Sequence, residues 1–150
     1  MESLDLFMSR SSLTETEFEQ YSISGDSLFS ECGLVERGRF VAKVQNVTTI
    51  APDTASELVA ATFAVHQLVK EKRPSFDPPG TKASPFDPGT YALKSSCGGE
   101  PLDIKTSFDA VVNGETKPTA ALGKLTKTLR LAAANGCGGR NFFGLTPLKR

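Results

Sequence analysis

The sequence predicts an α+β fold: a small, mostly antiparallel sheet packed against a central and a C-terminal helix, with a short helical N-terminal arm. Three segments carry this prediction. Residues 39–50 are rich in β-branched and apolar side chains, and residues 54–72 place apolar side chains at helical spacing. Residues 102–112 alternate between apolar and polar side chains. Helices and strands mixed in the order α-β-α-β-β-α are typical of the α+β class.

The first 36 residues are predicted to form an acidic arm of short helices. Ser12 and Thr14 are each followed three residues later by a glutamate, the pattern of a capping box at a helix start. Apolar side chains are sparse in this segment, so it has little with which to build a core of its own. Two alternatives stay open: the arm docks on the domain, or it becomes ordered on a partner.

Residues 37–136 are predicted to form a single α+β domain with a Pro-rich loop at 73–90. The strand at 39–50 has Asn46 on its apolar side, which predicts a bulge or a strand end at that position.

A helix is predicted from Thr54, which begins a capping box, to about Lys72, because Pro74 prevents its continuation. Val59 and Phe63 widen its apolar arc. An arc of this breadth predicts that the helix packs against a sheet.

The loop at 73–90 contains the turn motif Phe-Asp-Pro twice, ten residues apart. A loop of this length without regular structure is often functional. Phe76 and Phe86 are therefore candidates for two matched anchors in a partner's groove. The alternative is a pair of similar turns whose rings pack into the core of the domain.

The second half of the chain predicts a hairpin, a helix and a tail. Residues 91–94 and 102–112 form the two antiparallel strands. Pro118 lies in the first turn of a helix that ends at the pair Asn135-Gly136. Its exposed face is predicted to carry three cations: Lys124, Lys127 and Arg130. Residues 137–150 form a basic tail rich in Gly and Phe.

Charge is divided between the two ends of the chain, although the net charge is zero. Residues 1–36 hold eight acidic residues against one basic residue, a net charge of −7. Residues 105–150 hold eight basic residues against two acidic residues, a net charge of +6. Such asymmetry indicates an oriented interaction, either between the two ends within one chain or between neighbouring copies.

The three cysteines, an odd number, argue against a disulfide framework and predict a reducing, cytoplasmic location. Cys32, Cys97 and Cys137 are each followed by Gly, and with His66 they would complete the ligand set of a zinc site. No two of these ligands lie at the short spacing of a zinc knuckle, so we predict neither a metal nor any other cofactor. No apolar run is long enough to span a membrane.

Catalytic groups are not recognisable in the sequence. His66 is the single imidazole, and we predict that it lies at the edge of the core. Gly123-Lys124 resembles the end of a phosphate-binding loop, but the glycine five positions earlier is replaced by Pro118. Asp103 and Asp109 lie on the polar side of a predicted strand, where solvated carboxylates are commoner than an acid–base pair.

These observations predict a non-enzymatic structural or assembly subunit of a larger complex or particle, such as a virion. Its partner is a protein or a second copy, and the alternative is a small nucleic-acid-binding or regulatory protein that uses the basic helix and tail. Seven residues are the candidates for partner binding: Lys117, Lys124, Lys127, Arg130, Arg140, Phe76 and Phe86.

Overall fold

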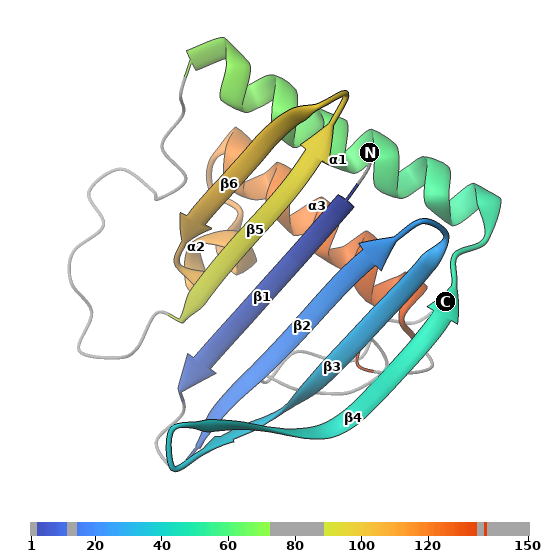
Figure 1. Ribbon diagram of the computed structural model, residues 1–150. Helices are drawn as coiled ribbons and strands as arrows, with labels where there is room; N and C mark the ends of the chain where they lie inside the picture. The colour runs from blue at the N-terminus through green and yellow to red at the C-terminus, as the bar shows by residue number, and fades with distance from the viewer. Residues whose placement is uncertain (1–2, 12–14, 73–88, 135–136, 138–150) are drawn as a thin grey trace.

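The computed structural model describes residues 3–11, 15–72, 89–134 and 137 of the 150-residue chain. The elements follow in the order β1 (Ser3–Ser11), β2 (Thr16–Ser24), β3 (Ser27–Glu36), β4 (Arg39–Thr49), α1 (Pro52–Lys72), β5 (Thr90–Cys97), β6 (Glu100–Thr106), α2 (Phe108–Asn113) and α3 (Lys117–Ala132). The strands form one antiparallel sheet in the order β4-β3-β2-β1-β5-β6. The helices all lie against one face of this sheet (Figure 1).

The predicted helical N-terminal arm is wrong, because residues 3–36 form three strands and β1 lies in the middle of the sheet. Leu4, Leu6 and Met8 occupy every second position of β1 and are buried. This period of two is the signature of a strand with one covered face. It outweighs the local capping-box pattern, because burial of a whole apolar row stabilises the chain more than one helix cap does.

The strand pattern of β2 is harder to recognise, because a charged residue interrupts it. Glu19 shares the buried side of β2 with Tyr21 and Ile23. The boundary expected between an arm and a domain at residue 37 falls inside the β3–β4 hairpin, where Glu36 pairs with Arg39.

The predicted strand at 102–112 is correct only in its first half. β6 ends at Thr106, and Ser107 caps the short helix α2 by accepting a hydrogen bond from the backbone N–H of Ala110 at 3.1 Å. A serine at this position favours a helix start over a continued strand. Phe108 and Val111, three positions apart, are then both buried on the same helical side.

The sheet, with six strands, is larger than the small sheet predicted. β4, the β5–β6 hairpin, α1 and α3 are present as predicted, although α3 ends at Ala132 and its predicted end at residues 135 and 136 lies outside the described residues. β4 covers nearly the whole segment expected at 39–50, β5 and β6 form an antiparallel hairpin, and α1 ends at Lys72. α3 begins with a capping box between Thr116 and Thr119, with Pro118 in its first turn. The irregularity expected at Asn46 lies elsewhere, since Asn46 pairs with Ser30 in register and the bulge falls opposite the step from Cys32 to Gly33.

The core lies between the sheet and the helix layer. Leu58, Ala61 and Val65 of α1 are buried, as are Leu122, Leu125 and Leu129 of α3. Val59 and Phe63, expected to widen the buried arc of α1, are exposed instead, because the sheet and α3 cover only one stripe of that helix. Among the described residues, no helix is both long enough and apolar enough to cross a membrane.

Candidate functional site

The face of the sheet opposite the helices has no helix or strand over it in the described part of the chain (Figure 1). Strand register decides which side chains lie there, because paired residues point to the same side. We call this surface the open face and the helix-covered side the closed face. The open face comprises Asp5, Phe7, Ser9, Phe18, Gln20, Ser22, Phe29, Glu31, Gly33, Val35, Phe40, Ala42, Gln45, Val47, Ala92, Lys94, Asp103 and Lys105.

An aromatic cluster lies on the open face. Phe40 of β4 meets Phe7 edge-on with ring centroids 5.5 Å apart, and it meets Phe18 in the same manner at 5.1 Å. Edge-to-face geometry at these distances is favourable for aromatic pairs. Phe18 is 1% exposed although no helix covers it, whereas Phe40 is 59% exposed. Phe40 therefore shields its neighbour while leaving most of its own side chain in contact with water.

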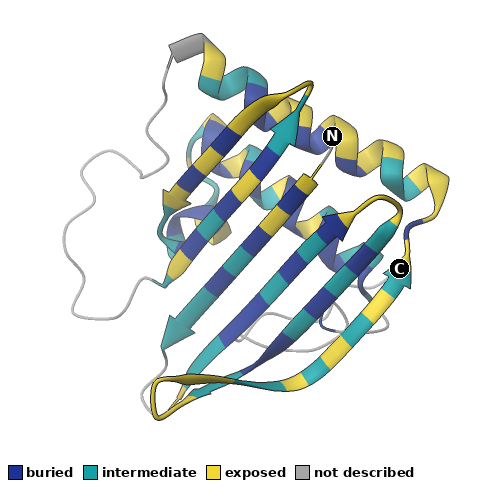
Figure 2. Ribbon diagram, viewed as in Figure 1, coloured by how far each residue is buried: buried dark blue, intermediate teal, exposed yellow. Residues whose placement is uncertain are grey.

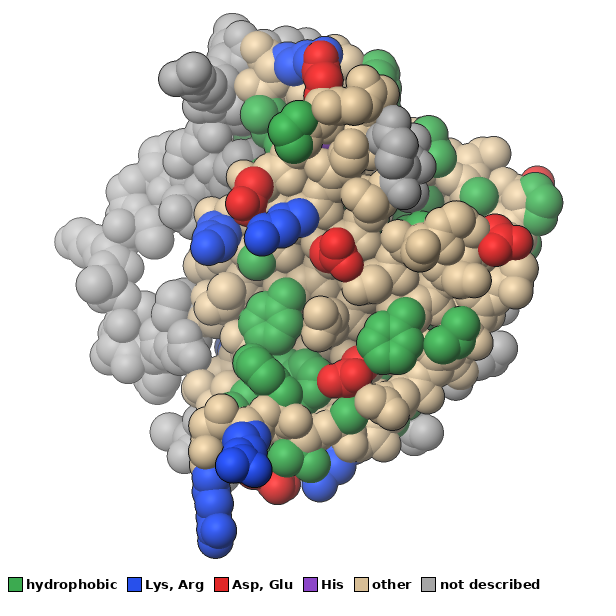
Figure 3. Space-filling model, in the orientation of Figure 1, with side chains coloured by type: hydrophobic (Ala, Val, Ile, Leu, Met, Phe, Trp, Pro, Cys, Tyr) green, Lys and Arg blue, Asp and Glu red, His purple; other side chains and the backbone are tan. Residues whose placement is uncertain are grey.

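A second apolar pair on the open face comprises Phe29 of β3 and Val47 of β4, which are paired across the two strands. Val47 is 68% exposed. Figure 3, which views the open face, shows hydrophobic side chains gathered in two groups over the sheet. Single exposed apolar residues are normal on protein surfaces, but clustered aromatic and branched side chains on one face are typical of interaction sites.

The charges on the open face are few and mixed in sign. Lys94 and Lys105 lie on β5 and β6, whereas the acidic residues are Asp5, Glu31 and Asp103. Asp5 accepts a hydrogen bond from the Ser22 hydroxyl at 2.7 Å. The open face therefore carries a net charge of −1, two cations against three anions, and it is not the positive surface that a nucleic-acid backbone requires.

Both edges of the sheet carry features that oppose the addition of another strand. In β4, the register with β3 shifts so that Lys43 stands unpaired between Ala42 and Val44. In β6, Pro101 lacks a backbone N–H. Bulges, lysines and prolines on edge strands are the usual protection against edge-to-edge pairing. Binding through the sheet is therefore favoured at its face rather than at its edges.

The glycine beside this bulge is required by the packing of the backbone. A Cβ atom at Gly33 would overlap the carbonyl oxygen of Val41 and would lie 2.8 Å from the backbone nitrogen of Lys43. Gly98 and Gly99, in contrast, form the β5–β6 turn with positive φ angles of 59° and 78°. The glycine of the Cys32-Gly33 pair is thus explained by the bulge, and the glycine of the Cys97-Gly98 pair by the turn, without a metal.

The predicted partner-binding cations do not form one exposed surface. Lys117, Lys124 and Lys127 are exposed on α3, whereas Arg130 is only 3% exposed and points into the molecule. The prediction that Arg130 lies on the exposed face of the helix is therefore wrong. Three of the predicted residues lie outside the described part of the chain: Phe76, Phe86 and Arg140.

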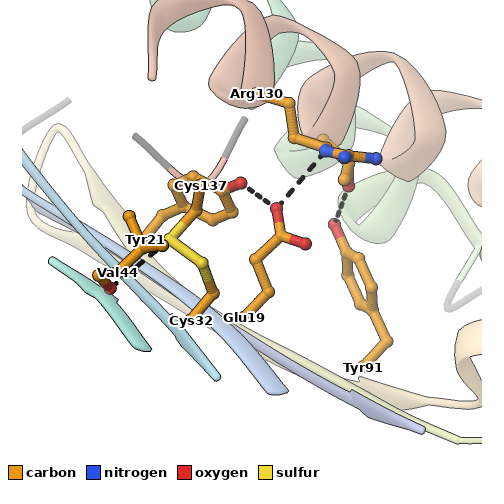
Figure 4. A network of polar contacts seen from close by, with 8 residues as sticks. Glu19, Tyr21, Cys32, Val44, Tyr91, Arg130 and Cys137 are labelled. Carbon is orange, nitrogen blue, oxygen red and sulfur yellow. Dashed lines mark hydrogen bonds and ion pairs between the residues drawn. A yellow bond between two sulfur atoms is a disulfide. The ribbon is translucent and has the colours of Figure 1, made fainter. Parts of the chain in front are cut away.

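Arg130 forms a buried ion pair with Glu19 of β2, with 3.3 Å between Arg130 Nε and Glu19 Oε1 (Figure 4). The Tyr21 hydroxyl donates a hydrogen bond to the same oxygen. Burial raises the pKa of Glu19 to about 7, and the attraction of Arg130 lowers it only in part. An acidic residue of the N-terminal segment thus meets a basic residue of the C-terminal helix within one chain, which is one of the two alternatives left open by the charge pattern.

A disulfide bond joins Cys32 of β3 to Cys137, beyond the end of α3 (Figure 4). Both residues are fully buried on the closed face, while Cys97 is a free thiol. The expectation of no disulfide is therefore wrong, because an odd count of cysteines excludes complete pairing but not one bridge. The argument from unpaired cysteines to a reducing compartment no longer holds, and the cytoplasmic location stays a prediction.

Of the residues considered above as zinc ligands, Cys32, Cys137 and His66 have other partners in the structure. Cys32 and Cys137 are bonded to each other, and the Nε2 atom of His66 lies 3.1 Å from the hydroxyl of Ser95 in the interior. In the described residues, no group of three or more histidine, cysteine or acidic side chains is placed to hold a metal ion. His66 is buried between α1 and β5, as expected of a histidine at the edge of the core.

The two carboxylates considered as an acid–base pair, Asp103 and Asp109, lie on opposite sides of the sheet. Asp103 belongs to the open face, whereas Asp109 of α2 lies 3.7 Å from Arg10 on the other side of the sheet. A hollow of about 460 Å³ between α1 and α3 is lined mainly by alanines. Glu57, Lys124 and Thr128 are its polar lining residues, and Lys124 is exposed to solvent.

The open face is the feature that the sequence did not predict as a site. A signal was present for Phe7, which falls between the buried positions of β1. Phe18 lies on the opposite side of β2 from Glu19 and Tyr21, so both rings point away from the helices. No family model matches this sequence, and no curated protein matches it either.

Proposed function

We propose that this protein is a non-enzymatic structural subunit that assembles with a protein partner through its open face. The aromatic cluster of Phe7, Phe18 and Phe40 is the observation that carries this proposal. Phe40 is largely exposed to water on this sheet face and Phe7 is partly exposed. A complex that covers these rings is stabilised by roughly 25 cal/mol for each Å² of apolar surface removed from water. Aromatic residues are also the usual anchors of protein interfaces.

The charge of the open face supports a protein partner over nucleic acid. Sheet faces that bind single-stranded nucleic acid combine stacking aromatics with a positive groove. Here the aromatics are present, but the surrounding charges sum to −1. The exposed lysines Lys117, Lys124 and Lys127 lie on α3, away from these aromatics, so charge and stacking are not combined on one surface.

The placement of the catalytic candidates also supports a subunit without enzymatic activity. His66, the single histidine, is buried and contacts Ser95, which is buried as well. A general base must reach the proton that it removes from a substrate, directly or through a water molecule. Both side chains of this pair are buried where α1 packs on β5, with His66 6% and Ser95 5% exposed.

Site-specific photocrosslinking in the cells that produce the protein tests the proposal. A benzophenone side chain replaces Phe40 on the open face, and in a matched control it replaces Val112, which is exposed on α2. We expect the probe at position 40 to give a discrete protein adduct that the probe at position 112 does not give. Equal labelling from both positions, or an adduct to nucleic acid alone, would overturn the proposal.

A further inference from the structure

We propose that the partner on the open face is a second copy of this chain, packed face to face about a two-fold axis that runs close to the strand direction between β1 and β2. This inference rests on the proposed function and names its partner. Closed two-fold dimers are the commonest protein assemblies, and they require a surface that is complementary to itself. The open face meets this requirement in its edges, its area and the arrangement of its charges.

The protected edges direct association toward the face. A second copy added at β4 would have to pair with a strand whose ladder is interrupted at Lys43, and one added at β6 would meet Pro101. Face-to-face packing needs no free backbone groups. Two aligned sheets pack at about 10 Å with a mean angle of about −30°, and a two-fold axis between two equally tilted sheets produces this arrangement.

The two halves of the open face complement each other under this symmetry. Rotation about an axis along the strands keeps each row of paired residues at the same height along the strands and reverses the order of the strands. As a result, β5 lies over β3 of the second copy and β6 lies over its β4. Lys94 then lies over the ring of Phe29 of the second copy, a cation–π arrangement. Lys105, opposite Gln45, comes within reach of Glu31 of the second copy. Each contact occurs twice, once on either side of the axis.

The aromatic cluster lies near the axis, because Phe7 and Phe18 belong to the two strands that flank it. In this register Phe7 of one copy lies over Gln20 of the second copy and Phe18 lies over its Ser9, so the partly exposed ring of Phe7 becomes covered in the middle of the interface. Six strands of about nine residues present a face of about 24 by 30 Å, roughly 700 Å² on each copy. This area approaches the approximately 800 Å² for each partner that a specific interface of standard size buries.

A charge swap in the purified protein tests this geometry. Sedimentation velocity over a concentration series measures the dimer dissociation constant for wild type, Lys105→Glu, Glu31→Lys and the double variant. Each single variant places like charges across the interface and is expected to weaken the dimer about tenfold, whereas the double variant restores the attraction and the affinity. Lys127→Glu, on α3, is the matched control and should leave the dissociation constant unchanged.

Phe40→Ser provides a second measurement, because Phe40 is exposed in the single chain and its loss should reduce dimerisation without unfolding the domain. Circular dichroism checks the fold of every variant. A monomer at all concentrations, or a dimer that is indifferent to all the open-face variants, would overturn the inference. Failure of the double variant to recover affinity would also overturn it. A heterologous adduct from the probe at position 40, together with a monomer in solution, would retain the proposed function and reject the second copy.

Discussion

The closed and open faces of the sheet are built from the same six strands, and each carries an exception to the usual distribution of polar and apolar side chains. The closed face buries an ion pair, Glu19 with Arg130, beside a disulfide bond. The open face leaves Phe40 and Val47 in water. Figure 2 shows how burial alternates along the central strands. Buried charges and exposed apolar clusters are the informative exceptions on proteins, and here each face carries one.

The two faces serve different ends. Burial of a charged pair adds little stability compared with apolar side chains of the same size, but it penalises every arrangement in which the pair is broken. The closed face therefore fixes how α3 lies on the sheet. The open face makes the opposite contribution: its exposed aromatics do little for the isolated fold and become buried only in a complex.

The largest expected effect comes from breaking the buried pair. Arg130→Leu leaves the carboxylate of Glu19 buried without its partner, and the free energy of unfolding at pH 8 should fall by about 3–5 kcal/mol. Denaturant titration followed by circular dichroism measures this change. The double variant Glu19→Gln with Arg130→Leu should recover much of the loss. A loss below 1 kcal/mol for the single variant would show that the pair is not enclosed as described.

A smaller effect is expected from pH, through the raised pKa of Glu19. Because the folded state binds this proton more tightly than the unfolded state, the contribution of Glu19 to stability is fully present below about pH 4.5 and is lost as the pH rises through about 7. The difference amounts to about 3 kcal/mol over that interval. Comparing wild type with Glu19→Gln at pH 5 and pH 8 isolates it, since other titrating groups contribute equally to both proteins. A constant difference at the two pH values would contradict the assignment.

The sequence predicted the elements whose patterns are uninterrupted and missed those that contain a functional or buried polar residue. α3, with its capping residues and leucine stripe, and β4 were recognised because their local patterns agree with their surroundings. β2 was missed because Glu19 occupies a core position that only a distant arginine makes tolerable. Neither this pair nor the bridge from Cys32 to Cys137 has a local signature, since each joins segments more than 100 residues apart.

The candidate site was missed for a related reason. An arm of short helices over residues 1–36 gives the rings of Phe7 and Phe18 no common face, and only strand pairing brings them beside Phe40. The charge asymmetry, in contrast, was correctly recognised as a feature of the chain. Its position was misjudged, because Arg130 contributes to the interior rather than to the surface of α3.

The smallest expected effect on stability comes from the open face itself. Phe40→Ser removes an exposed ring that shields Phe18, and its cost to the free energy of unfolding of the monomer should be about 1 kcal/mol, the size of its edge-to-face contacts. Phe63→Ser, which removes a similarly exposed ring from α1, is the matched control. Neither variant should lose more than about 1 kcal/mol in denaturant titrations at low protein concentration. The two should differ in sedimentation at high concentration, where only Phe40→Ser dissociates. A loss well above 1 kcal/mol for Phe40→Ser at low concentration would mean that this ring supports the fold, and the contrast between the two faces would then fail.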